Sequence, residues 1–229
     1  MEIRRLSLIE GARRAKGFAV AIDVLRASSH IVTLFARGAI EIAPVETVAQ
    51  ARDLKQHHPE WILAGEREGL PPEGFELGNS PFEAEQRDFS GRTVILTTSA
   101  GSRGLVAAGR GAEEVVVGCF LNAPALVDFI QRRQPEIVSL LALGVGGTAP
   151  APEDEGAAAF LEGLLRGENP DLPAIFEGIR SHPEGRKFLD PGCPNYRPED
   201  LEACLRSGVY DIVPVMRKGR LRVDGEERG

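Results

Sequence analysis

Short apolar runs alternate with longer amphipathic segments through the first two thirds of the chain. The segments between the runs carry apolar residues at helical spacing, as in residues 47–57. Apolar runs this short, set between helical segments, indicate buried strands. The predicted strands are residues 3–9, 18–22, 39–43, 61–65, 93–98, 114–118 and 137–143. This alternation of strand and helix favours right-handed crossovers and a largely parallel sheet.

The pattern changes after residue 148. A Pro- and Ala-rich spacer at 149–152 leads into helical segments, and a late strand at 210–215 and a short edge strand at 220–223 follow. We therefore predict an α/β fold, a three-layer α/β/α arrangement with a mixed, largely parallel sheet. Residues 1–148 form the sheet region, and 149–229 form a more helical C-terminal portion that is either part of the same domain or a second lobe. The charged tail, 217–229, is predicted to fray.

Composition narrows the class of protein. The 229 residues carry 27 basic and 34 acidic side chains, a net charge of −7, which argues against a nucleic-acid partner. No apolar run approaches the ~20 residues of a membrane span, and the N-terminus does not have the pattern of a signal peptide. Three cysteines without a CxxC motif fit a reducing compartment. We predict a cytoplasmic protein with no membrane partner, for which a homodimer is one state to consider.

Polar residues recur directly after the predicted strands. In open α/β sheets, ligands bind at the carboxyl ends of the strands, so these residues should converge on one crevice. Ser28 or Ser29 is the expected N-cap of the helix that follows the second strand. The clusters are Asp23, Arg26 and Ser28; Glu66 and Arg67; Thr97, Thr98, Ser99, Ser102 and Arg103; Cys119 and Asn122; and Glu153 and Asp154.

The arginines of these clusters are candidates to bind phosphate or sulfonate. Guanidinium groups match the oxygens of such anions in a bidentate manner. The alternative for each is an ordinary ion pair, and we favour that alternative for Arg67 considered alone. The three arginines are Arg26, Arg67 and Arg103.

The carboxylates are candidates to bind Mg²⁺, which takes oxygen ligands but usually only one or two from protein carboxylates. Asp23, Glu66, Glu153 and Asp154 therefore cannot all be direct ligands. Glu153 and Asp154 also stand where the start of a helix favours acidic residues in any case.

Several known phosphate-handling motifs are missing. The chain has no P-loop, and Leu25 occupies the place of the second acid in an Asp-x-Asp phosphatase motif. The glycines at 144, 146 and 147 follow a strand but do not complete a dinucleotide-binding fingerprint.

At the level of motifs, the sequence resembles the 2-phosphosulfolactate phosphatase (ComB-type) family. The most specific shared block is the GFELGNSPFE of residues 74–83, which includes Asn79. The remaining motifs are IDVLRASS at 22–29, AGER at 64–67, LTTSAGSR at 96–103, GCFLNA at 118–123 and the acidic pair at 153–154.

The resemblance implies a Mg²⁺-dependent hydrolase that acts on a small anionic phosphorylated substrate. The reaction converts 2-phospho-3-sulfolactate to 3-sulfolactate and phosphate, a step of coenzyme M formation. On this basis Asp23, Glu66 and Glu153 are predicted metal ligands, and Asp23, Arg26 and Asp154 are predicted catalytic residues. Asp154 is the predicted general base, with a covalent intermediate on Asp23 as the alternative to direct attack by water. The predicted substrate-binding residues are Arg26, Arg67, Asn79, Thr98, Ser102, Arg103 and Asn122.

Two positions depart from the family pattern. The family usually has asparagine where this chain has Ala100, and Cys-Ala-Gly where this chain has three alanines at 157–159. These departures leave two alternative functions open. One is a non-catalytic protein that binds small anions, and the other is a phosphatase of broader specificity for substrates without a sulfonate.

Overall fold

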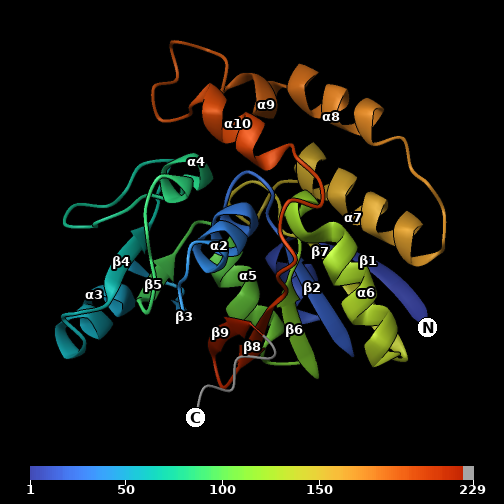
Figure 1. The fold of residues 1–229 in the computed structure, drawn as a ribbon, viewed down its shortest axis with the longest axis horizontal. Helices are drawn as coiled ribbons and strands as arrows, with labels where there is room; N and C mark the ends of the chain where they lie inside the picture. The colour runs from blue at the N-terminus through green and yellow to red at the C-terminus, as the bar shows by residue number, and fades with distance from the viewer. Residues whose placement is uncertain (224–229) are drawn as a thin grey trace.

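One nine-stranded mixed sheet organises the part of the chain that the computed structural model describes, residues 1–223 (Figure 1). The predicted α/β fold with a mixed, largely parallel sheet is confirmed. The strands are β1 (Glu2–Ser7), β2 (Phe18–Ile22), β3 (Glu41–Pro44), β4 (Ile62–Gly65), β5 (Thr93–Thr97), β6 (Glu114–Val117), β7 (Ile137–Ala142), β8 (Pro214–Arg217) and β9 (Arg220–Val223).

The helices connect these strands and form most of the C-terminal portion. They are α1 (Leu8–Arg13), α2 (Ala27–Ala36), α3 (Val48–His57), α4 (Pro81–Glu85), α5 (Gly101–Ala108), the 3₁₀ helix η1 (Phe120–Asn122), α6 (Ala123–Arg133), α7 (Pro152–Leu165), α8 (Leu172–Ser181), α9 (Pro183–Arg186) and α10 (Pro198–Cys204).

The sheet consists of two parallel blocks joined by a hairpin. Its strand order is β1-β7-β2-β6-β8-β9-β3-β5-β4. Pairing is parallel within β1-β7-β2-β6 and within β3-β5-β4. The hairpin of β8 and β9 pairs antiparallel with β6 on one side and with β3 on the other. The late strands thus lie in the middle of the sheet, and the prediction of an edge strand at 220–223 is wrong.

The predicted strand at 210–215 is also shifted, because β8 begins at Pro214. The segment before it bonds to a helical turn: the backbone N–H groups of Val209 and Tyr210 both donate to the carbonyl of Leu121. The pattern of apolar residues in a sequence does not show which carbonyl groups the backbone N–H groups of a segment will hydrogen-bond to. The last residues of the predicted frayed tail, 224–229, lie outside the described residues.

At the N-terminus, β1 ends at Ser7 and residues 8–13 form α1, where the sequence predicted a strand that continues to residue 9. A helix of six residues is too short to display helical periodicity. Gly11 allows the helix to sit close to the preceding strand, since a Cβ there would meet the Leu6 Cβ at 3.1 Å.

The main apolar core includes residues from both halves of the chain. Leu201 and Cys204 of α10 and Leu221 of β9 belong to the same buried cluster as Val20 and Leu140 of the central strands. In Figure 1, α8, α9 and α10 form an arc over the end of the molecule where the loop after β2 enters α2. This arc places C-terminal residues opposite the strand-end loops.

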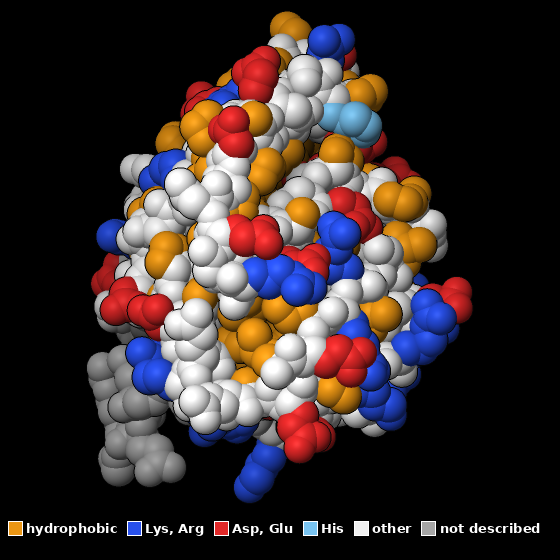
Figure 2. Space-filling view, turned by 90° about the vertical axis from the view of Figure 1, so that its right-hand side faces the viewer, with side chains coloured by type: hydrophobic (Ala, Val, Ile, Leu, Met, Phe, Trp, Pro, Cys, Tyr) orange, Lys and Arg blue, Asp and Glu red, His pale blue; other side chains and the backbone are white. Residues whose placement is uncertain are grey.

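The surface is mixed in charge. On the side of the molecule shown in Figure 2, acidic and basic side chains are interspersed, with hydrophobic groups exposed between them. Among residues 1–223, no helix combines the length and apolar character needed to cross a membrane.

Candidate active site

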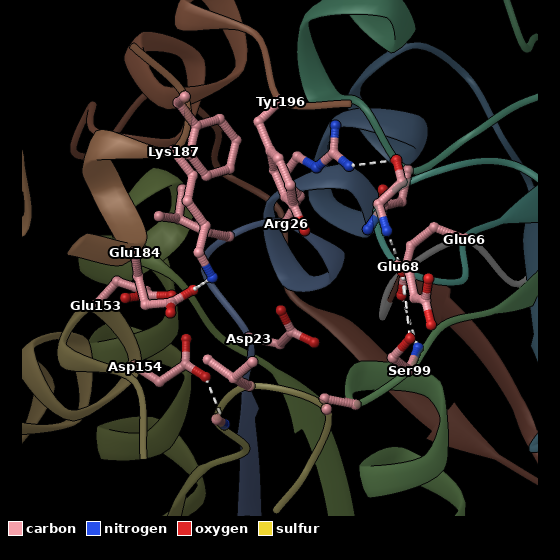
Figure 3. Close-up of a pocket in the computed structure, with 18 residues that line it drawn as sticks. Asp23, Arg26, Glu66, Glu68, Ser99, Glu153, Asp154, Glu184, Lys187 and Tyr196 are labelled. Carbon is pink, nitrogen blue, oxygen red and sulfur yellow. Dashed lines mark hydrogen bonds and ion pairs between the residues drawn. The ribbon is translucent and has the colours of Figure 1, made fainter. Parts of the chain in front are cut away.

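A cavity of about 330 Å³ lies between the strand-end loops and the segment around α9 (Figure 3). The carboxyl ends of β2, β4, β5 and β7 all contribute to its wall, so four of the predicted strand-end segments do converge. Its lining residues are Asp23, Leu25, Arg26, Glu66, Glu68, Gly69, Asn79, Ser99, Ala100, Gly144, Val145, Gly146, Glu153, Asp154, Glu184, Lys187, Phe188 and Tyr196.

Asp23 stands directly after β2, and its carboxylate points into the middle of the cavity (Figure 3). The backbone N–H of Ala27, at the start of α2, donates to its Oδ1 at 3.3 Å. Gly101, at the start of α5, lies so close that a Cβ there would come within 2.9 Å of Asp23 Oδ2. Burial raises the pKa of Asp23 to about 6, and the negative charge of Glu66 adds to the rise.

The N-cap of α2 is Arg26, so the predicted capping role of Ser28 or Ser29 is wrong. The Ser28 hydroxyl instead accepts a hydrogen bond from the Asp23 N–H at 2.9 Å and donates to the carbonyl of Ala21. Ser28 therefore fixes the backbone that carries Asp23.

Two other carboxylates connect neighbouring loops. Asp154 accepts hydrogen bonds from the N–H of Val24 and the N–H of Gly144, both at 2.7 Å. Glu66 accepts from the N–H of Ser99 at 2.7 Å and from the N–H of Gly69 at 3.0 Å. Asp154 thus ties the loop after β2 to the loop after β7, and Glu66 ties the loops after β4 and β5.

Glu153 differs from these two because its Oε2 is buried and has no hydrogen-bond partner among the described residues. Its side chain is only 4% exposed and lines the cavity. Burial raises the pKa of Glu153 to about 7, and the charge of Asp23 contributes. An unpartnered carboxylate oxygen facing a second carboxylate is an arrangement that a divalent cation would stabilise.

The oxygen ligands present fit Mg²⁺, which usually takes only one or two protein carboxylates and completes its shell with water or substrate. Within residues 1–223 there is no group of three or more His, Cys, Asp and Glu side chains arranged to hold a metal ion. Of the predicted ligands, Glu153 has an unpartnered oxygen and Asp23 stands in the middle of the cavity, whereas both oxygens of Glu66 accept hydrogen bonds from its loops.

Replacing Glu153 by glutamine should stabilise the metal-free protein at alkaline pH. Its pKa of about 7 in the folded state lies above the ordinary value of 4.5, so the folded state binds more protons between these values. Stability is therefore lost as pH rises through this window. We expect Glu153→Gln in EDTA to melt on the order of 5 °C above wild type at pH 8 and at about the same temperature at pH 4. A lower melting temperature for the variant at pH 8 would contradict this interpretation.

Arg26 reaches the cavity through a set of contacts with the C-terminal portion. Its Nη1 lies 2.7 Å from Asp200 Oδ2, and its Nη2 donates to the Gly69 carbonyl at 3.1 Å. The guanidinium carbon lies 5.9 Å from the ring centroid of Phe188 and 5.6 Å from that of Tyr196, within cation–π range. A guanidinium has more N–H donors than these two bonds use, so Arg26 retains donors for a ligand.

Asp200 is a residue of this site that the sequence analysis missed. It is fully buried on α10, and besides Arg26 it accepts hydrogen bonds from the Ser80 hydroxyl at 2.5 Å and the Phe82 N–H at 3.2 Å. It lies far along the chain from every strand-end cluster, and no local pattern distinguishes it from other acids in a first helical turn.

Of the predicted substrate-binding residues, Asn79 lines the cavity, as Arg26 does. Its Oδ1 is buried without a hydrogen-bond partner among the described residues. Asn79 is therefore placed to contact a ligand.

The other predicted arginines do not line the cavity. Arg67 donates to the Thr97 hydroxyl at 2.9 Å and to the Glu66 carbonyl at 2.6 Å, so it holds strand ends together. Arg103 donates to the carbonyls of Ser99 and Gly146 at 3.1 and 3.5 Å, behind two loops of the cavity wall. These contacts give both arginines a structural role, and anion binding by Arg67 and Arg103 stays a prediction.

The side chains of the remaining predicted residues are engaged in hydrogen bonds with other parts of the protein. Thr98 and Ser102 exchange hydrogen bonds, each hydroxyl accepting from the other residue's N–H at 2.8–2.9 Å. Asn122 accepts from the Cys119 N–H and donates to the carbonyls of Val117 and Ile212. The loop after β6 therefore does not reach the cavity, and no ligand contact is assigned to Thr98, Ser102 or Asn122.

Comparison with known proteins identifies the family. Residues 4–219 match the family model described as 2-phosphosulpholactate phosphatase. The chain belongs to the 2-phosphosulfolactate phosphatase family.

Named relatives cover nearly all of this family member. A Thermotoga maritima protein named "Probable 2-phosphosulfolactate phosphatase" is 31% identical over 88% of this chain and 89% of its own length. Proteins of the same name from Caldanaerobacter subterraneus and Carboxydothermus hydrogenoformans are 32% and 30% identical, the latter over 98% of both chains.

Proposed function

We propose that this protein is a phosphatase that hydrolyses 2-phospho-3-sulfolactate to 3-sulfolactate and phosphate, with Mg²⁺ as cofactor. The observation that carries the proposal is the family match over residues 4–219. The cavity supports it, because buried carboxylates and a guanidinium meet there in a space suited to a small organic phosphate.

The charge of the site argues for a metal ion. Six carboxylates and two cationic side chains line the cavity among the described residues. The substrate itself carries about four negative charges at neutral pH. An anion of this charge would be repelled unless a cation accompanied it, so binding of substrate and metal should be coupled.

Asp23 and Glu153 would hold the Mg²⁺. The bound ion would neutralise the phosphate and stabilise charge on the transferring phosphoryl group. In phosphoryl transfer, the protein contributes mainly by positioning the reacting groups and by stabilising the charge of the transition state. Asp23 would contribute negative charge from the end of β2. The Ser28 hydroxyl fixes its backbone, and the start of α5 packs closely against its carboxylate.

Arg26 would bind the phosphate oxygens. Asp200 and the Gly69 carbonyl hold its guanidinium in one orientation, which lowers the entropy lost when substrate binds. Asn79 would add a polar contact from the loop before α4.

For Asp154 we propose a role other than the predicted general base. Both of its oxygens accept backbone hydrogen bonds, so we propose that it positions the loops that carry Asp23 and Gly144. Glu66 does the same for the loops after β4 and β5 in this proposal.

We also propose that the protein acts in the cytoplasm. Its three cysteines, Cys119, Cys193 and Cys204, are free thiols, which suits a reducing compartment. The absence of a nucleic-acid partner and a homodimeric state stay predictions.

The function is tested by comparing phosphate release from 2-phosphosulfolactate and from 2-phospholactate, which lacks the sulfonate. We expect kcat/KM to be at least about tenfold higher for 2-phosphosulfolactate, because 2-phospholactate lacks the sulfonate and so loses one charged hydrogen bond to the protein. Equal values for both esters would instead favour a phosphatase of broader specificity. Binding of 3-sulfolactate without any phosphate release would favour a non-catalytic anion-binding protein. The broader alternative has a structural basis, because Ala100 lies in the cavity wall.

A further inference from the structure

The cavity offers few positive charges for a substrate with several acidic groups. Of the described residues that line it, Arg26 and Lys187 are the cations. Arg26 is buried and already engaged with Asp200 and Gly69. Lys187 is therefore the cation available to form an ion pair with a second acidic group on the ligand.

Lys187 follows α9 and projects into the cavity from the side opposite Glu66 (Figure 3). Its Nζ lies 2.5 Å from Glu184 Oε2, and this carboxylate also lines the cavity. The two side chains are 36% and 26% exposed. An ion pair this open to solvent contributes little net free energy, so exchanging Glu184 for a ligand anion costs little.

The position of Lys187 separates its ammonium from the guanidinium of Arg26. Figure 3 shows its ammonium on the side of the cavity that holds Glu153 and Glu184, whereas Arg26 and Tyr196 lie across the cavity from it. The ammonium lies beside Glu184 and on the same side of the cavity as Glu153, one of the two proposed metal-binding carboxylates. A small ligand with phosphate at Arg26 can thus place another acidic group near Lys187.

We propose that Lys187 determines specificity by binding one of the two acidic groups of the substrate that are not transferred, and that Glu184 holds its ammonium when the site is empty. This inference rests on the proposed function and deepens it. The favoured substrates are small phosphate monoesters that carry a further acid ionised at neutral pH, either a sulfonate or a carboxylate.

The test compares Lys187→Met with Lys187→Arg on three esters: 2-phosphosulfolactate, 2-phospholactate and isopropyl phosphate, which has no second acid. Binding of 3-sulfolactate is measured in parallel by calorimetry. For Lys187→Met we expect KM for 2-phosphosulfolactate and Kd for 3-sulfolactate to rise about 10- to 100-fold. The KM of Lys187→Met for isopropyl phosphate should stay within about twofold of wild type. Lys187→Arg should recover most of the affinity for 2-phosphosulfolactate and 3-sulfolactate, because it restores the positive charge.

Two further variants sharpen the result. Arg186→Met, which removes an exposed cation from the adjacent position, should leave all values unchanged. Glu184→Gln should lower the Kd for 3-sulfolactate several-fold, because the competing carboxylate is gone. A loss on 2-phospholactate as large as on 2-phosphosulfolactate assigns the carboxylate to Lys187, and a loss confined to the sulfonated ester assigns the sulfonate.

The inference would be overturned if Lys187→Met raised KM equally for all three esters, or if it left the Kd for 3-sulfolactate unchanged. Its failure is distinct from that of the proposed function. A wild-type protein that binds 3-sulfolactate but hydrolyses none of the esters would refute the phosphatase proposal, and the binding data would still decide the role of Lys187.

Discussion

Replacing Asp23 by asparagine should lower kcat for phosphate release from 2-phosphosulfolactate by about 10²–10³-fold, the loss expected when one preorganised electrostatic contact to a transition state is removed. Asp23 is buried and central in the cavity, and it influences the pKa of both Glu153 and Asp154. Asparagine keeps the size of the side chain but not its charge. The measurement is steady-state phosphate release at saturating substrate and Mg²⁺.

The fold should survive this change. Neutralising Asp23 removes a carboxylate whose ionisation burial already opposes, so the metal-free variant should be at least as stable as wild type at neutral pH. Asp128→Asn, on the exposed side of α6, is a matched control and should keep wild-type turnover. Near-full activity of Asp23→Asn would show that the central charge of the site has been assigned to the wrong residue.

Replacing Asp200 by alanine should lower the free energy of unfolding by about 3–5 kcal/mol, because it leaves the buried guanidinium of Arg26 without its counter-charge. The side chains of this pair are 6% and 0% exposed. The Ser80 hydroxyl and the Phe82 N–H would lose their acceptor as well. Urea denaturation followed by circular dichroism measures the effect.

A neighbouring ion pair supplies the control. Glu202 also lies on α10 and pairs with Arg180 at 3.0 Å, but at the surface, so Glu202→Ala should cost less than about 1 kcal/mol. The double variant Arg26→Met/Asp200→Asn should be more stable than Asp200→Ala, since no unpaired charge remains buried. Equal destabilisation by Asp200→Ala and Glu202→Ala would show that the buried pair contributes no more than a surface pair.

The strand-end residues show how far sequence reasoning reaches. Asp23, Glu66 and Glu153 could be predicted to meet because each follows an apolar strand or begins a helix, and the structure does bring them to one cavity. What each carboxylate does there was not predictable. Both carboxylate oxygens of Asp154 accept hydrogen bonds from backbone N–H groups of other loops, and the sequence does not show such contacts.

The differences between the sequence analysis and the structure have a common physical origin in long-range contacts. Asn122 looked like a ligand-binding amide because it follows a strand, yet its partners include the carbonyl of Ile212, ninety positions along the chain. Lys187 and Tyr196 looked like ordinary residues of the helical portion, and they line the cavity only because the α8–α10 arc folds over the strand ends. The placement of β8 and β9 inside the sheet was hidden for the same reason.

The central claim is that buried carboxylates at the ends of the strands act with Mg²⁺ on a phosphate ester. It is tested most directly by measuring phosphate release from 2-phosphosulfolactate after the protein has been treated with EDTA, and again after Mg²⁺ is returned. We predict that release stops with chelation and recovers with Mg²⁺ in wild type, whereas Asp23→Asn stays at least about 100-fold slower after Mg²⁺ is returned. Undiminished phosphate release by the chelated wild-type protein would contradict the account.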